Sequence, residues 1–133
     1  MEVQAKKRKL LLIDDEPLMG ALLKNKFKLK YEVTLKLNGL EGLSYILDGN
    51  VPDVVILDLN MPVMGGIEFI QEVRKFNYLH HIVLIVLSGE ESAASRIDAF
   101  NAGADDFLIK PFNMAELSIR IERFFTRYKF DKL

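Results

Sequence analysis

The chain has 133 residues, of which half are hydrophobic and 28% are charged; its net charge is −1 and it has no cysteine. This length favours one domain, and the lack of cysteine excludes disulfides, thiolate zinc sites and cysteine nucleophiles. No stretch approaches the roughly 20 apolar residues of a membrane span, and the start lacks a signal-peptide pattern. We therefore expect a cytoplasmic protein. Its small net charge creates no overall electrostatic field that would favour binding to nucleic acid or a membrane.

The two ends of the chain are expected to lie outside the folded domain. Residues 1–8 form a polar lead-in, and the basic run over residues 6–9 is interpreted as solubilising charge rather than a binding site. The domain is placed at residues 9–127, and residues 128–133 are a tail or the start of a linker.

The first half of the domain alternates apolar runs with helical patterns. A buried strand is expected at 10–13, a helix from Pro17, a half-exposed strand at 31–37, a helix over 40–47 and a buried strand at 54–57. The inner stripe of the first helix is expected to comprise Leu18, Leu22, Leu23, Phe27 and Leu29. The second helix is expected to hold Leu40, Leu43, Ile46 and Leu47.

The second half continues the alternation. A helix is expected from Ile67 to near Asn77, a buried strand at 82–87, a helix over 90–101 and a short strand at 107–109. Asn113 then suits the N-cap of a last helix, whose apolar positions are Leu117, Ile119, Ile121, Phe124 and Phe125. Five βα units of this kind predict a doubly wound, five-stranded parallel sheet with helices on both faces.

Polar side chains terminate four of the expected strands. They are Asp14 and Asp15, Asp58, Ser88 and Lys110. Each has an ordinary structural interpretation, since Asp58 or Ser88 alone could sit in a turn. However, the carboxyl ends of parallel strands lie along one edge of a sheet, where ligands are bound. We therefore expect these side chains to form one site.

The residue types indicate phosphoryl chemistry. Clustered carboxylates need a cation among them, and oxygen ligands without cysteine favour Mg²⁺. A lysine and a hydroxyl supply a positive charge and a donor for a phosphoryl group. An aspartate can itself be the nucleophile and form an acyl phosphate.

Four segments together resemble the receiver domain of two-component response regulators, which has a flavodoxin-like fold. They are Leu11-Leu12-Ile13-Asp14-Asp15-Glu16-Pro17, Asp58-Leu59-Asn60-Met61-Pro62 with Met64-Gly65-Gly66, Leu87-Ser88-Gly89, and Ala102-Gly103-Ala104-Asp105-Asp106-Phe107 through Lys110-Pro111-Phe112. The resemblance covers roughly residues 9 to 127 and fits either a stand-alone receiver or part of a longer regulator.

The resemblance implies a role for each site residue. Asp58 is the phosphoacceptor for a histidine kinase or phosphotransfer protein, and Mg²⁺ is held by Asp14, Asp15, Asp58 and the backbone carbonyl of Asn60. Ser88 and Lys110 contact the phosphoryl group, and Phe107 rotates into the space that Ser88 leaves. The Lys110–Pro111 bond is expected to be cis. Such a domain is not an enzyme, although it assists its own phosphorylation and dephosphorylation.

Two further sets of residues follow from the same resemblance. Asn60 and Glu90 would tune autohydrolysis, which predicts a short-lived phosphoryl state. Arg96, Asp106, Glu116 and Arg120 fall where regulators place charges for a symmetric dimer through the fourth helix, fifth strand and fifth helix. The alternative for these charges is solvation, or pairing of Asp106 with Arg120 within one chain.

A Mg²⁺-dependent phosphatase with an aspartate nucleophile is the competing hypothesis. That class needs a second acid two residues after the nucleophile, and here Asn60 holds the position. We therefore favour a signalling switch that acts through a partner or a homodimer and does not itself bind nucleic acid.

Overall fold

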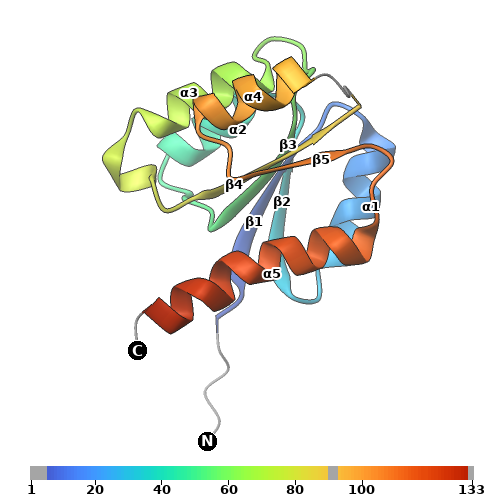
Figure 1. The fold of residues 1–133 in the computed structure, drawn as a ribbon, viewed down its shortest axis with the longest axis vertical. Coiled ribbons are helices and arrows are strands. Elements are labelled where there is room, and N and C mark those ends of the chain that lie inside the picture. The colour runs from blue at the N-terminus through green and yellow to red at the C-terminus, as the bar shows by residue number, and fades with distance from the viewer. Residues whose placement is uncertain (1–5, 90–92, 132–133) are drawn as a thin grey trace, which may run out of the picture.

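The computed structural model describes residues 6–89 and 93–131, in which strands and helices alternate. The strands are β1 (Arg8–Ile13), β2 (Tyr31–Lys36), β3 (Val54–Asp58), β4 (Val83–Ser88) and β5 (Asp106–Ile109). The helices are α1 (Pro17–Phe27), α2 (Gly39–Leu47), α3 (Gly66–Arg74), α4 (Ala93–Ala102) and α5 (Met114–Asp131), with a 3-10 turn η1 (Asn77–Leu79) after α3. All strand pairs are parallel, in the order β2-β1-β3-β4-β5 (Figure 1). The predicted (βα)5 architecture is confirmed.

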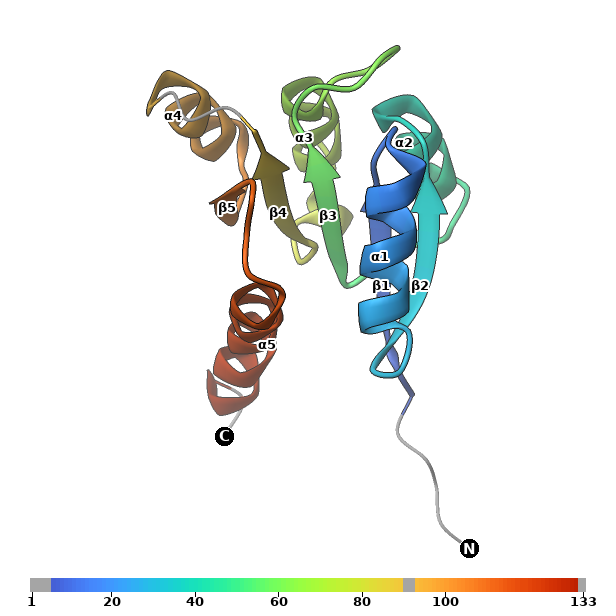
Figure 2. The ribbon, with the colours of Figure 1, turned by 90° about the vertical axis from the view of Figure 1, so that its right-hand side faces the viewer.

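The sheet separates two hydrophobic layers. Helices α1 and α5 cover one face, and α2, α3 and α4 cover the other (Figures 1 and 2). Side chains alternate along β1, so that Leu10 and Leu12 pack on the α1/α5 side while Leu11 and Ile13 pack on the other. This two-sided burial explains why β1, β3 and β4 are nearly continuous apolar runs.

The inner stripe predicted for α1 is partly wrong. Leu23 and Phe27 are buried, but Leu18, Leu22 and Leu29 are 74%, 51% and 80% exposed. The buried face passes instead through Gly20, where an added Cβ would lie 3.0 Å from the side chain of Leu35. A side chain at this position would therefore crowd Leu35 of β2. Three apolar positions of the second and last predicted helices are also exposed, namely Leu40, Leu47 and Ile119.

The element boundaries differ little from those predicted. The fourth helix is described from Ala93, and the expected start at residues 90–92 lies outside the described residues. The last helix continues to Asp131, beyond residue 127 where we placed the domain boundary. Over the described residues, no helix has both the length and the apolar character needed to cross a bilayer.

Candidate functional site

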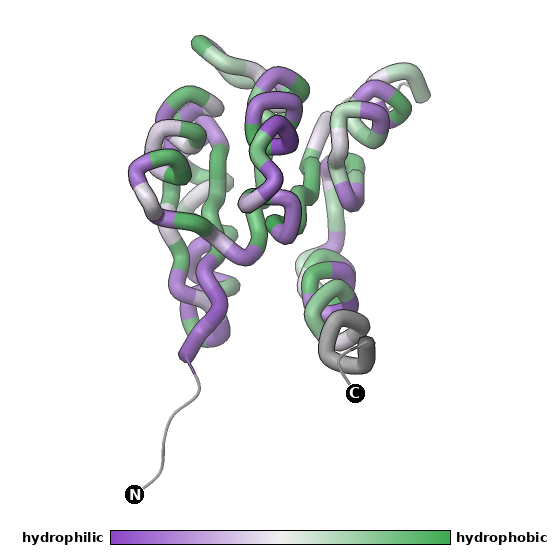
Figure 3. The backbone as a smooth tube through the Cα atoms, turned by 90° about the vertical axis from the view of Figure 1, so that its left-hand side faces the viewer, coloured by the Kyte–Doolittle hydropathy of each residue, from purple (hydrophilic) through white to green (hydrophobic). Residues whose placement is uncertain are grey.

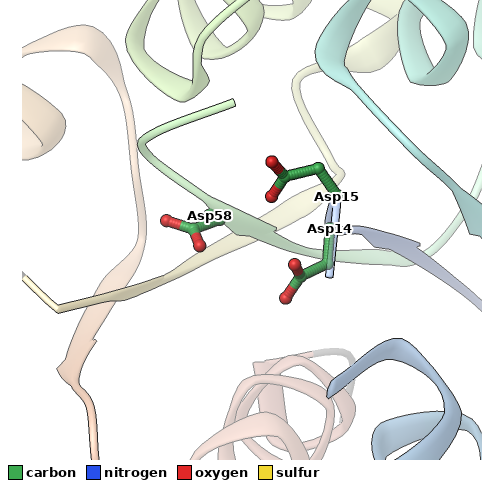
Figure 4. Close-up of side chains that lie close together, drawn as sticks. All are labelled: Asp14, Asp15 and Asp58. Carbon is green, nitrogen blue, oxygen red and sulfur yellow. The ribbon is translucent and has the colours of Figure 1, made fainter. Parts of the chain in front are cut away.

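Three carboxylates converge at the carboxyl edge of the sheet. Asp14 and Asp15 directly follow β1, and Asp58 ends the neighbouring strand β3, where Ile13 pairs with Leu57. One carboxylate oxygen from each aspartate lies within 4.8 Å of the others. Figure 4 shows the side chains of Asp14 and Asp15 leaving the end of β1 in different directions, with Asp58 beside them. The predicted acidic cluster is therefore formed.

Asp14 is the most enclosed of the three. It is only 5% exposed, and this burial raises the pKa of its carboxyl group above the ordinary value. The backbone N–H of Glu16, which donates to Asp14 Oδ1 at 2.8 Å, and the charge of Lys110 oppose the rise, whereas the charge of Asp58 adds to it. Glu16 was not singled out from the sequence as a site residue, because its contribution comes from the backbone.

Lys110 brings a positive charge to Asp58. Its Nζ lies 2.9 Å from Asp58 Oδ2, and the backbone N–H of Asn60 donates to Asp58 Oδ1 at 3.2 Å. Burial alone would lower the pKa of Lys110, but the hydrogen bond and charge of Asp58 outweigh it and raise the pKa. The following peptide bond to Pro111 is cis, as expected. The lysine is therefore charged and held at the acidic cluster.

Ser88 and Phe107 connect this edge to the outer strands. Ser88 ends β4 and is fully buried, and its carbonyl accepts the backbone N–H of Lys110 at 2.8 Å. Asp58 pairs with Leu87 in the sheet, so Ser88 lies one residue further along the adjacent strand. Phe107 on β5 is 8% exposed and packs in the layer beneath α2, α3 and α4. The sheet thus links Asp58 to Phe107 through β4.

The loop after β3 is positioned by its backbone. Gly66 donates its N–H to the carbonyl of Leu59 at 2.9 Å, and a Cβ there would lie 2.6 Å from the carbonyl oxygen of Asp58. Only glycine permits this approach. Val63 has a φ of 71°, which is unusual for a β-branched residue. The segment carrying Asn60 is therefore anchored at Gly66.

Three of the four charges proposed for a dimer face already form ion pairs within the described chain. Arg120 Nη1 is 3.0 Å from Asp106 Oδ1, and its Nη2 is 3.0 Å from Glu116 Oε1. Arg96 is exposed on α4 and borders, with Phe107, Glu116 and Arg120, an open groove of about 360 Å³. Pairing of Asp106 with Arg120 within one chain, which we had considered as the alternative, is present. Glu90 lies outside the described residues.

Comparisons with known proteins agree with this geometry. The family described as "Response regulator receiver domain" matches residues 10–122. The chain is 34% identical over 120 residues to "Transcriptional regulatory protein PrrA" of Mycobacterium tuberculosis, covering 90% of this chain and 50% of that protein. It is 38% identical over 116 residues to "Probable transcriptional regulator ycf27" of Porphyridium aerugineum, covering 86% and 47%.

A solved structure is similar over nearly its whole length. The receiver domain of Francisella response regulator 1452 superposes with a TM-score of 0.82 at 32% identity, covering 92% of this chain and 99% of that one. The chain spans about half the length of the curated relatives it matches. The family match, the parallel sheet and the acidic edge agree, and the chain belongs to the response regulator receiver domains of two-component systems.

Proposed function

We propose that this chain is a phosphorylation-controlled switch in which Asp58 accepts a phosphoryl group from a histidine kinase or phosphotransfer protein. The observation that carries the proposal is the placement of Asp58, whose Oδ2 lies 2.9 Å from Lys110 Nζ and whose carboxylate borders Asp14 and Asp15. Only 12% of the Asp58 side chain is exposed, which limits but does not block access. This combination provides a nucleophile beside a fixed positive charge.

The transfer step follows from these groups. An oxygen of Asp58 attacks the phosphorus of a phosphohistidine, and a P–O bond forms as the P–N bond to the imidazole breaks. The imidazole keeps the electron pair and takes up a proton from solvent. Lys110 leaves its ion pair with the carboxylate and contacts the phosphoryl oxygens instead. Later attack of water on phosphorus releases phosphate and restores the Asp58 carboxylate.

The acidic cluster suits Mg²⁺. Asp14, Asp15 and Asp58 offer only oxygen ligands, within 4.8 Å of one another, and we propose the backbone carbonyl of Asn60 as a further ligand. When bound, the ion would neutralise phosphoryl oxygen charge during transfer.

Thermal melting tests this assignment without phosphorylation. Mg²⁺ should raise the melting temperature of the wild type and not of Asp15→Asn. Without Mg²⁺, the variant should melt no lower than the wild type, because one of three neighbouring charges is removed. An equal effect of Mg²⁺ on both proteins would contradict the metal site.

We propose that Ser88 and Phe107 transmit the change. A phosphoryl group on Asp58 adds acceptor oxygens one residue from the buried end of β4. Movement of Ser88 toward it would free space for Phe107, which also borders the groove between α4 and α5. Phe107 has no hydroxyl, so its rotation would depend on packing alone.

Phosphoryl labelling with a small phosphodonor and Mg²⁺ tests the main proposal. The wild type should gain one phosphoryl group per chain, Asp58→Ala none, and the exposed control Asp98→Asn the same as wild type. Continuous turnover of p-nitrophenyl phosphate would instead favour the phosphatase. The polar residue two positions after Asp58 is the amide Asn60, which cannot serve as the general acid of a phosphatase.

The lifetime of the phosphoryl group tests a separate prediction. A phosphoryl half-life of many hours would contradict the predicted tuning of autohydrolysis by Asn60 and Glu90.

We propose a symmetric dimer through α4, β5 and α5 as one output. It requires Arg120 to exchange its contacts within the chain for contacts with a second copy, while Arg96 meets the partner's Glu116. Sedimentation with and without phosphodonor tests this. Phosphorylation should promote dimers in the wild type and not in Glu116→Arg, and dimerisation insensitive to both changes would exclude the proposal.

A further inference from the structure

Positive charge is concentrated at the edge of the sheet opposite Asp58. Of the 18 lysines and arginines in the chain, eight fall within residues 6–30, namely Lys6, Lys7, Arg8, Lys9, Lys24, Lys26, Lys28 and Lys30. The three acids in the same stretch are at positions 14–16, at the far end of β1. A net charge of −1 therefore conceals a basic cluster around the start of β1 and the end of α1. The first described segment, residues 6–9, is strongly hydrophilic, and the turn from α1 to β2 lies at the same end of the molecule (Figures 2 and 3).

Four of these lysines surround one open depression, which we call the lysine depression. Lys6 and Lys7 come from the segment before β1, and Lys24 and Lys28 come from the end of α1. The depression measures about 560 Å³, and Glu32 is the one carboxylate among its lining residues. The helix dipole accounts for cations at the end of α1, but not for two more on a separate segment.

The charges of the lysine depression are not neutralised within the described part of the chain. Lys30 is paired with Glu122 at 2.7 Å and Lys110 with Asp58 at 2.9 Å, whereas none of the four lysines has a carboxylate partner there. Lys7 donates one hydrogen bond to the carbonyl of Lys28 at 3.2 Å, which leaves most of its donor capacity for solvent or a ligand.

An apolar side chain lies at the tip of the same edge. Leu29 is 80% exposed between Lys28 and Lys30, in the turn that joins α1 to β2. A single exposed leucine is ordinary. Flanked by cations at a protruding turn, it matches the combination of basic and apolar groups with which peripheral proteins contact anionic bilayers.

We propose that the lysine depression and Leu29 form a docking surface for an anionic lipid bilayer, with the lysines on the headgroups and Leu29 inserted between them. A nucleic-acid backbone would also attract the lysines, but it has no apolar region into which Leu29 could insert. Tyr31, the one aromatic residue of the depression, is only 6% exposed and cannot stack on bases. This proposal departs from our expectation of no membrane contact and of a solubilising role for residues 6–9, which rested on charge alone.

The geometry leaves the phosphorylation site available while the chain is docked. The six residues of β1 separate Lys7 from Asp14, which corresponds to about 20 Å along an extended strand. The docking surface faces the bilayer while Asp58 faces away from it. The proposal therefore does not depend on phosphorylation of Asp58.

Vesicle flotation of the full chain tests the surface. Phosphatidylcholine vesicles containing phosphatidylglycerol should retain the wild type at low salt, and vesicles of phosphatidylcholine alone should not. Lys24→Gln/Lys28→Gln should weaken retention by about tenfold or more, and Leu29→Ser by about threefold. The matched control Lys36→Gln/Lys75→Gln removes the same charge elsewhere and should bind like the wild type, as should Asp58→Ala.

Several outcomes would overturn the proposal. These are absence of retention by anionic vesicles, equal losses in the two double-lysine variants, and retention unchanged by Leu29→Ser. Binding of double-stranded DNA in fluorescence anisotropy at the same salt, without vesicle retention, would instead assign the lysines to a nucleic-acid backbone. Circular dichroism of each variant checks that these exposed substitutions leave the fold intact.

Discussion

Two ion pairs lie at opposite edges of the sheet and have the same separation. Asp58 Oδ2 is 2.9 Å from Lys110 Nζ at the carboxyl edge, and Asp105 Oδ2 is 2.9 Å from Arg74 Nη2 at the amino edge. Asp105 also accepts the backbone N–H of Leu84 at 2.8 Å. Distance alone therefore does not distinguish a structural pair from a reactive one.

The surroundings of each cation make the distinction. Arg74 donates to the carbonyl of Gly103 at 3.0 Å and to that of His80 at 3.2 Å, besides Asp105. Its planar fork is thereby occupied by three acceptors from two chain segments, the turn after η1 and the loop between α4 and β5. Lys110 is a compact charge on a long stem. Its side chain contacts the carboxylate of Asp58, and further carboxylates lie nearby. The arginine pair ties two chain segments together, and the lysine pair is the one that we propose exchanges its partner for a phosphoryl group.

The largest expected contrast is chemical. Asp58→Asn should abolish labelling by a phosphodonor, because an amide is not a nucleophile toward phosphorus at neutral pH. Asp105→Asn should keep labelling at the wild-type level per folded chain, since Asp105 lies at the other edge. Intact-mass measurement after labelling distinguishes the two, and loss of labelling in a folded Asp105→Asn would break the comparison.

Replacing each cation with alanine should affect stability more at the amino edge, whereas labelling is expected to depend on the carboxyl edge. Arg74→Ala should lower the free energy of unfolding by about 2–3 kcal/mol, because it strands Asp105 and two carbonyls. Lys110→Ala should cost less than Arg74→Ala, since the described contacts of Lys110 include one side-chain hydrogen bond, to Asp58, whereas Arg74 holds a carboxylate and two carbonyls. Urea unfolding in the absence of Mg²⁺ measures both. A larger loss for Lys110→Ala would identify it as the structural pair.

The sequence predicted one of these pairs and not the other. Asp58 and Lys110 each end an apolar run, so the rule that parallel strands share a carboxyl edge was enough to bring them together. Arg74 appeared only as part of a helical pattern, and Asp105 as part of a family motif. Their contact depends on where the end of α3 meets the start of β5, which no periodicity encodes.

The misassigned face of α1 has a related cause. Hydrophobic periodicity weights large apolar residues, and it therefore selected Leu18 and Leu22, which are exposed. The buried face is set by Gly20, whose lack of a side chain admits Leu35. Hydrophobic periodicity follows large side chains, so it cannot predict a contact that depends on the absence of a side chain at Gly20.

Exchanging arginine for lysine at one pair and lysine for arginine at the other tests the same comparison through a smaller change in the free energy of unfolding. Arg74→Lys keeps the charge but loses the fork, and it should cost about 1–2 kcal/mol in the free energy of unfolding. Lys110→Arg also keeps the charge and should change stability by less than about 0.5 kcal/mol. Chemical denaturation of both variants provides the measurement. Equal losses would show that the fork of Arg74 contributes nothing beyond its charge.

The smallest expected effect is a pH dependence at Asp105. Burial raises the pKa of this carboxyl group, and the hydrogen bonds from Leu84 and Arg74 only partly oppose it. Because the folded-state pKa lies above the unfolded value of about 3.9, the contribution of Asp105 to stability is complete below that pH and is lost as pH rises through the folded-state pKa.

The stability of the wild type relative to Asp105→Asn should therefore fall as pH rises above the unfolded-state pKa of about 3.9. Urea unfolding at a series of pH values measures this difference, and Asp98→Asn on the exposed side of α4 is the matched control. A difference that instead grows with pH would mean that Arg74 stabilises the charged form of Asp105 more than burial penalises it. An ion pair would then outweigh burial at the amino edge, as it does for Lys110 at the carboxyl edge.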